Sequence, residues 1–347
     1  MKSLITFAIP SVITGTENDR TLGKSIVSTW QQQGIFQVAL TDEQSRTTQR
    51  AFSRSKLFFG RSLEEKSGFV SESTYSGYIA SQEEQTDGEP DYSEIFTICQ
   101  DISKTDRRYL QNWPCHGPVP WPDNDYRDDL QAFMEMAGEI GNALLRLTAL
   151  GLGLPIDALT DLTHKGWHHM RVLRFQKAEE HTSRGIGAHT DYGLLVIAAQ
   201  LGADGLDIRP PLTPEGHKEK RKKNWIPGQS MAGEYKNDAH WRRVPLRDNV
   251  LTVFPGDLLQ YISGDILMAT PHKVALHPQK ERYAIAYFHE PNFEASLTPL
   301  VGTNIPERVH YGRHFTDIFM RCYPQKPTTL KIIREGHYAL LDTIGKS

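Results

Sequence analysis

The sequence predicts a mainly β protein with flanking helices, built around a double-stranded β-helix, or jelly-roll, core. Three observations support this prediction. Between residues 167 and 288, seven short strand-like segments follow one another, separated by Gly, Pro and Asp. A broad apolar stripe over 128–153 predicts a long helix that braces a sheet. Short strands of this number and spacing are typical of a jelly roll.

The N-terminal region, 1–165, is predicted to be helical with one long loop region. Apolar positions recur with helical spacing over 22–33, and Gly34 precedes a strand-like segment at 35–38. Residues 41–66 indicate further helix. Residues 71–121 are rich in Gly, Pro, Ser and aromatic side chains. We therefore expect a long ordered loop region there, because aromatic residues argue against disorder.

The predicted core occupies 166–296 and the C-terminal helices 297–347. Its strands are 167–175, 194–199, 205–208, 250–254, 258–262, 273–276 and 283–288. Residues 210–241 are a polar excursion with a basic run at 217–223, for which a solvated hairpin tip is favoured over a nucleic-acid patch. Residues 308–323 and 328–341 predict the closing helices. With no internal repeat, we expect a single domain over 1–347.

Composition excludes several classes of protein. The formal net charge of −3 provides no basic excess for nucleic acid or an anionic membrane, and no apolar run is long enough to span a bilayer. The N-terminus lacks the features of a signal peptide. The three cysteines are widely separated and predict free thiols in a reducing cytoplasm. We expect small-molecule ligands; nothing in the sequence indicates an oligomeric state.

One histidine and one carboxylate stand two residues apart in 187–193 and are followed by an apolar run. In an extended chain His189 and Asp191 project from one face, and His272 in a later strand-like segment is the best third ligand. Two imidazoles and one carboxylate on one side of an ion leave open positions, as in non-haem Fe(II) oxygenases. A His-x-Asp pair also serves zinc hydrolases, but nothing near these residues has the pattern of a general base.

Two predicted strands place arginines beside this site. Alternation puts Arg282, Ala284, Ala286 and Phe288 on one face, where small residues leave room beside a cation. Arg282 suits the far carboxylate of a keto acid, although a surface arginine at a strand start is the alternative. In 167–175, Arg171 shares a face with apolar neighbours. Burying it without an anion is costly, so we expect ligand contact.

These motifs resemble those of the isopenicillin N synthase-like group of Fe(II)- and 2-oxoglutarate-dependent oxygenases. The matching motifs are His189-Thr190-Asp191, Pro271-His272-Lys273-Val274, Arg282 and Phe254-Pro255-Gly256-Asp257. Longer segments resemble the ethylene-forming members of that group: 75–78, 113–121, 167–175, 183–200, 287–295 and 319–324. The resemblance spans nearly the whole chain. The alanine at position 284, where the wider group often has serine, favours these narrower members.

The resemblance also implies which residues hold each ligand. Fe(II) is expected at His189, Asp191 and His272. The 2-oxoglutarate pocket is expected from Arg282, Arg171, Leu173, Phe175, Ala198 and Phe288. The guanidinium of L-arginine is expected near Glu84, Thr86 and Tyr192, and its carboxylate near Arg321 and Tyr323. This polarity is physically reasonable, because arginine side chains face carboxylates and a carboxylate faces the guanidinium.

Two reactions follow from the resemblance, both using Fe(II), 2-oxoglutarate and O2. In one, 2-oxoglutarate fragments to ethylene and carbon dioxide in the presence of L-arginine. In the other, decarboxylation to succinate drives hydroxylation of L-arginine at C5, which gives guanidine and pyrroline-5-carboxylate. The loops 276–281 and 210–241 differ from the bacterial pattern and could weaken ethylene output. The alternatives are a hydroxylase of another small metabolite and a non-catalytic protein that binds metal and 2-oxoglutarate.

Overall fold

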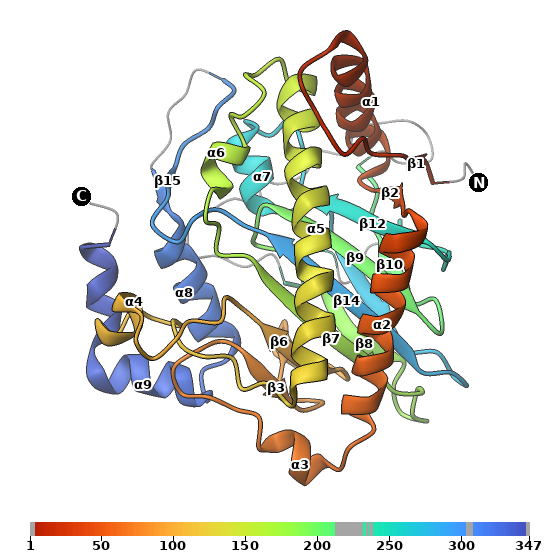
Figure 1. The fold of residues 1–347 in the computed structure, drawn as a ribbon. Coiled ribbons are helices and arrows are strands. Elements are labelled where there is room, and N and C mark those ends of the chain that lie inside the picture. Colours follow the sequence, from red (N-terminus) through yellow and green to blue (C-terminus); the bar gives the residue numbers. More distant parts are fainter. Residues whose placement is uncertain (1–3, 212–231, 234, 236–238, 303–307, 345–347) are drawn as a thin grey trace.

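Two β-sheets form the centre of the computed structural model (Figure 1), which describes residues 4–211, 232, 233, 235, 239–302 and 308–344. The larger sheet contains β1 (Thr6–Phe7), β2 (Phe36–Ala39), β12 (Val250–Pro255), β9 (Leu195–Leu201), β14 (Arg282–His289), β7 (His169–Phe175), β6 (Glu94–Ile98) and β3 (Gly77–Ile79), in that spatial order. The smaller sheet contains β11 (Arg242–Arg243), β10 (Leu206–Ile208), β13 (His272–Ala275) and β8 (Arg184–His189). Two further sheets contain two strands each: β4 (Gln85–Thr86) pairs with β5 (Glu89–Pro90), and β15 (Ser296–Leu297) pairs with β16 (Val309–His310).

Helices cover the outer face of the larger sheet. The long α5 (Asn124–Gly151) runs beside α1 (Glu17–Gln33) and α2 (Asp42–Phe59) and packs against β9 and β14 (Figure 1). The other helices are α3 (Leu63–Ser67), α4 (Arg107–Leu110), α6 (Thr160–Thr163), α7 (Asp257–Ile262), α8 (Tyr311–Cys322), α9 (Pro327–Glu335) and a final 3₁₀ turn, His337–Asp342. Within the described ranges, no helix combines the length and the apolar composition that crossing a membrane requires.

Aromatic packing orders the region between α2 and α5. The Phe58 ring lies 5.0 Å from Phe96 and 5.3 Å from Tyr126, measured between ring centroids. These three side chains come from α2, β6 and α5 and are almost fully buried. Because one cluster joins three elements that are distant in sequence, β6 is fixed against the helices and extends the larger sheet.

Most predicted elements are present, with two corrections. Residues 258–262, predicted as a strand, belong to helix α7, and all six residues of this helix are buried. A short apolar run carries no period that separates strand from buried helix. The predicted loop region 71–121 contains β3 and β6, because residues 94–98 are buried on both faces and therefore do not alternate.

The structure does not test two other predictions, which concern residues 210–241 and the division into domains. Most of the polar excursion at 210–241 lies outside the described residues. The division of the chain into 1–165, 166–296 and 297–347 within one domain stays a prediction.

Two glycines let α1 and α5 touch. A Cβ on Gly23 would lie 2.2 Å from the Leu147 carbonyl oxygen, and one on Gly151 would lie 2.3 Å from the Gly23 oxygen. We predict that Gly23→Ala lowers the free energy of unfolding by about 1–3 kcal/mol, although alanine is the better helix former by about 1 kcal/mol. Urea unfolding measures this. Lys24→Ala, exposed on the same helix, should change it by less than about 0.5 kcal/mol. An unchanged midpoint for Gly23→Ala would contradict the prediction.

Candidate active site

A cavity lies between the two sheets and is lined from both. Strand β7 contributes Arg171, Leu173 and Phe175, and β14 contributes Arg282, Ala284, Ala286 and Phe288. The predicted alternation of these two strands is therefore confirmed. Val196, Ala198, Gln200 and Phe254 complete the larger-sheet side, while Ile186, His189, Leu206, His272 and Val274 come from the smaller sheet. Asp191, which follows β8, also lines the cavity.

Three predicted metal ligands meet at one side of this cavity. Strands β8 and β13 pair with His189 opposite His272, so the two imidazoles stand side by side. The Asp191 carboxylate lies 3.7 Å from His189 Nε2 and 3.5 Å from His272 Nε2. The ligand atoms of the three residues lie within 4.8 Å of one another. This is the donor set of a non-haem Fe(II) site with open positions.

The local hydrogen bonds prepare both imidazoles for a metal. His189 Nδ1 lies 2.8 Å from the Gly187 carbonyl oxygen, and His272 Nδ1 lies 3.1 Å from the Thr270 oxygen. Each carbonyl accepts the Nδ1 proton, which leaves Nε2 with its lone pair directed at Asp191. Burial lowers the pKa of His272 to about 4, so this ring is neutral at neutral pH. The residues therefore fit a divalent ion.

The turn after Asp191 is held by groups to which sequence analysis assigned no role. The Asp191 carbonyl accepts a hydrogen bond from Asp257 N at 2.8 Å, where α7 begins. The buried Glu290 carboxylate accepts from Leu194 N at 3.1 Å. A Cβ on Gly193 would lie 1.7 Å from Glu290 Oε1, so only glycine permits this approach. Gly193, two residues after Asp191, was the feature of the sequence that could have indicated a tight turn here.

Arg282 is buried in the cavity without an acidic partner among the described residues. Its Nη2 donates to Gln200 Oε1 at 2.9 Å, and its guanidinium lies 4.8 Å from the Phe175 ring centroid. Nε and Nη1 have no hydrogen-bond partner within the part of the chain that the structure describes. Burial lowers the pKa of Arg282 to about 10, which leaves it charged at neutral pH. The arrangement fits a ligand carboxylate.

Arg171 has a partner within the chain that sequence analysis did not predict. Ligand contact is expected there because burying a guanidinium without an anion is costly, and in the structure the guanidinium forms a buried ion pair with Glu84. The Tyr323 hydroxyl donates to the other Glu84 oxygen at 2.5 Å. Burial is the largest single influence on Glu84 and opposes its ionisation, but the Arg171 charge and the hydrogen bonds from Tyr323 and Arg171 together outweigh it, so the pKa of Glu84 is lowered. Two residues expected to bind different ligands are thus paired with each other.

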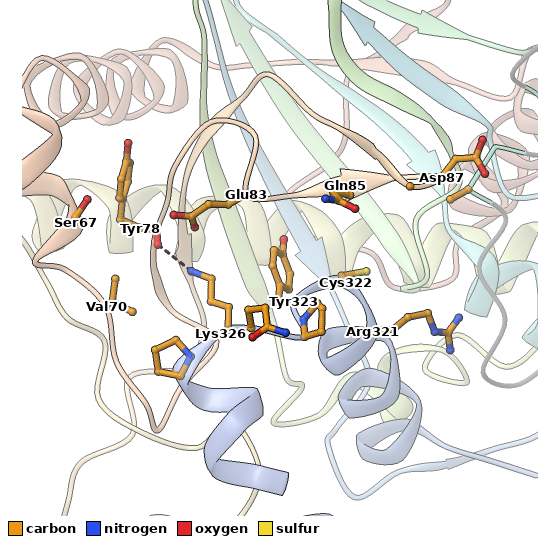
Figure 2. Close-up of a pocket in the computed structure, with 15 residues that line it drawn as sticks. Ser67, Val70, Tyr78, Glu83, Gln85, Asp87, Arg321, Cys322, Tyr323 and Lys326 are labelled. Carbon is orange, nitrogen blue, oxygen red and sulfur yellow. Dashed lines mark hydrogen bonds between the residues drawn. The ribbon is translucent and has the colours of Figure 1, made fainter. Parts of the chain in front are cut away.

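An outer pocket lies on the other side of this pair. Figure 2 shows its wall, which includes Tyr323, Arg321, Lys326 and Glu83. Tyr323 lines the outer pocket and Arg171 lines the cavity between the sheets. The hydrogen-bonded chain Tyr323–Glu84–Arg171 therefore forms the partition between the two spaces. The Arg321 side chain points away from Tyr323 in this view.

The two remaining residues predicted for L-arginine have internal partners. Thr86 Oγ1 donates to Asp91 Oδ2 at 2.6 Å. The Tyr192 hydroxyl lies 3.2 Å from His169 Nε2, and the His169 ring stacks on Phe288 with centroids 4.5 Å apart. His169 thus connects a predicted substrate residue to a predicted cosubstrate residue. Sequence analysis assigned it no role.

The chain is similar to known oxygenases along its whole length. The 2OG-Fe(II) oxygenase superfamily model matches residues 226–291, and a model for the N-terminal region of non-haem dioxygenases in morphine synthesis matches residues 6–124. A 2-oxoglutarate-dependent ethylene/succinate-forming enzyme from Ralstonia nicotianae is 53% identical over 348 aligned positions, covering 100% of this chain and 99% of that protein.

More distant relatives share the fold. A homoarginine-6-hydroxylase of Arabidopsis thaliana is 26% identical over 57% of this chain and 52% of its own length. The crystal structure of a full-length Neurospora crassa protein in complex with alpha-KG and 5-formyluracil superposes with a TM-score of 0.70 at 20% identity, covering 92% of this chain and 95% of that one. The predicted jelly-roll core with flanking helices is confirmed.

Lys326, in the outer pocket, generates a pH-dependent prediction. Its Nζ donates to the Tyr78 carbonyl oxygen at 2.9 Å (Figure 2), and burial lowers its pKa to about 8. The unfolded chain binds this proton up to about pH 10.4. Between these values the unfolded state therefore holds more protons, so rising pH favours the folded state.

We predict that Lys326→Met removes this slope. Between pH 7.5 and 10, the free energy of unfolding of the unsubstituted protein should rise relative to the variant, on the order of 1–2 kcal/mol. Urea unfolding of both proteins in the same buffers measures the difference, in which other titrating groups cancel. A difference that is constant with pH would show that burial does not suppress the Lys326 charge.

Proposed function

The chain belongs to the 2-oxoglutarate- and Fe(II)-dependent oxygenases, and we propose that it is one of the ethylene-forming members. It forms ethylene and carbon dioxide from 2-oxoglutarate in the presence of L-arginine. It also hydroxylates L-arginine at C5, giving guanidine and pyrroline-5-carboxylate with succinate. The full-length likeness to the Ralstonia enzyme supports the first reaction. The surroundings of Glu84 support the use of arginine.

In this proposal His189, Asp191 and His272 hold Fe(II). When bound there, the ion supplies the redox chemistry that joins O2 to the decarboxylation of 2-oxoglutarate. Arg282 binds the distal carboxylate of 2-oxoglutarate through the donors that lack partners among the described residues. Ala198 lies on the strand beside Arg282, which leaves space for the cosubstrate, whereas Phe175 limits its width and excludes water.

A single observation carries the arginine assignment: Glu84 already binds a guanidinium, that of Arg171, in a buried setting with Tyr323 as a second partner. A substrate guanidinium from the outer pocket would find the same carboxylate. The 2-oxoglutarate carboxylate at the cavity side would in turn take Arg171. Each ligand therefore replaces one member of the pair, so the charge balance is kept while both bind.

We also place the protein in the cytoplasm with small-molecule ligands only. Cys99, Cys115 and Cys322 are free, and the first two are buried among apolar side chains. Free thiols are expected in a reducing compartment.

The first experiment measures ethylene in the headspace of purified protein with Fe(II), 2-oxoglutarate, L-arginine and air. We expect ethylene that depends on arginine, and its loss in His189→Ala, because that variant removes one of three metal donors. Succinate that depends on arginine without ethylene would restrict the protein to arginine hydroxylation. The absence of both products would contradict the proposal and favour a hydroxylase of another metabolite.

The second experiment tests the guanidinium site with Glu84→Gln. A charge-assisted hydrogen bond contributes roughly 1.5–3 kcal/mol, so the KM for L-arginine should rise by about 10- to 100-fold. Glu135→Gln is the control, because Glu135 is an exposed carboxylate on α5 that lines neither the outer pocket nor the cavity between the sheets. Its KM should stay within about threefold of the unsubstituted protein. Equal effects of the two substitutions would contradict the assignment of Glu84.

A further inference from the structure

Two of the three residues predicted near the substrate guanidinium, Glu84 and Thr86, lie on a hairpin that belongs to neither of the two main sheets. Strands β4 and β5 pair only with each other among the described strands, and Glu84 and Thr86 stand on the first arm. Asp91 N donates to the Glu84 carbonyl at 2.9 Å, which closes the hairpin. Tyr92 N donates to the Gly185 carbonyl on β8 at 2.8 Å, the backbone bond that follows the hairpin. This single backbone hydrogen bond does not fix the orientation of the hairpin, so side-chain contacts must hold it beside the metal-ligand candidates.

The Arg184 side chain, from the first residue of β8, supplies the connection. Its Nη2 donates to the Thr86 carbonyl oxygen at 2.8 Å, and its Nε donates to the Pro90 carbonyl oxygen at 3.1 Å. Nη1 donates to the Glu89 carboxylate at 3.0 Å. The planar guanidinium therefore bonds both arms of the hairpin at once, which a lysine ammonium could not do in the same plane.

A buried carboxylate completes the junction. Asp91 is fully buried, and its Oδ1 accepts from Arg184 Nη2 at 3.1 Å and from Gly187 N at 3.0 Å. Its Oδ2 accepts from the Thr86 hydroxyl at 2.6 Å. One carboxylate thus joins the hairpin, the guanidinium and the backbone of the strand that ends at His189.

The packing leaves no room for adjustment. A Cβ on Gly187, two residues before His189, would lie 2.3 Å from Arg184 Nη2 and 2.9 Å from the Thr86 Cβ. The Arg184 guanidinium and the hairpin therefore pack directly against β8, the strand that ends at His189. A displacement of either would move Glu84 relative to His189.

We propose that Arg184 is a positioning residue that sets the distance between the guanidinium-binding hairpin and the metal ligands. This inference rests on the proposed function. Arg184 touches neither the cavity between the sheets nor the outer pocket within the described residues. Its loss therefore displaces L-arginine without removing any contact to 2-oxoglutarate. Because the product ratio depends on the placement of the substrate, the ratio of ethylene to succinate changes with the hairpin.

The test compares Arg184→Gln and Arg184→Lys with Arg146→Gln, which removes an arginine that pairs with Asp157 on another part of the surface. We expect Arg184→Gln to raise the KM for L-arginine on the order of tenfold and to change the ethylene-to-succinate ratio. Decarboxylation of 2-oxoglutarate without arginine should stay within about twofold. For Arg184→Lys, the KM for L-arginine and the product ratio should lie between those of Arg184→Gln and those of the unsubstituted protein. If Arg184→Gln does not fold, Arg184→Lys is compared with the unsubstituted protein instead. Arg146→Gln should match the unsubstituted protein.

Hydrogen exchange provides a readout that does not depend on activity. In metal-free protein, the amides of 82–92 should exchange faster in Arg184→Gln, while those of β9 and β14 are unchanged. If the unsubstituted protein does not respond to arginine, the proposed function fails but the exchange result still decides whether Arg184 holds the hairpin. Unchanged exchange over 82–92 would overturn the inference, as would arginine-dependent and arginine-independent turnover that fall in parallel.

Discussion

A charge buried between two sheets must have an opposite charge or a ligand that brings one. The structure satisfies this constraint in two ways within one cavity. Arg171 has the Glu84 carboxylate, whereas Arg282 has, among the residues that the structure describes, only the Gln200 amide and the face of Phe175. Arg282 is therefore prepared for an incoming anion, but Arg171 becomes available only by exchange. This difference gives the two arginines separate roles, although both line the same space.

Strand pairing and one turn determine where the residues of the site lie. Pairing of β8 with β13 sets the two imidazoles opposite each other, and the turn held by Glu290 brings Asp191 back to them. The same β8 begins with Arg184, which holds the hairpin that carries Glu84. One six-residue strand thus has a candidate metal ligand, His189, at one end and the attachment of the β4–β5 hairpin at the other. Rigid spacing between them is a direct result of extended backbone.

Much of the site could be predicted because its residues alternate on strands. The faces of 167–175 and 282–288 follow from a period of two. The meeting of the three metal-ligand candidates does not, because Asp191 lies in the turn beyond the end of β8 and His272 is set opposite His189 by strand pairing. The Arg171–Glu84 pair could not be predicted, because it joins residues 87 positions apart through a hairpin whose path no local pattern specifies. Arg184 was missed for another reason: several of its acceptors are backbone carbonyls, which every residue type has. Residues 258–262 were predicted as a strand because the segment is short and buried on all sides, which leaves no helical period in its sequence.

The proposed exchange at the partition, Tyr323–Glu84–Arg171, would also select ligands by their charge. A molecule that reaches Tyr323 from the outer pocket meets a carboxylate that is already neutralised, so shape alone gives it no advantage. Citrulline has nearly the outline of arginine but a neutral ureido group, so by displacing Arg171 it would leave the buried Glu84 carboxylate without an opposite charge. If L-arginine binds at Glu84 as proposed, the partition discriminates between near-identical amino acids through electrostatic exchange, at a point separated from the metal ligands by the Arg171 side chain.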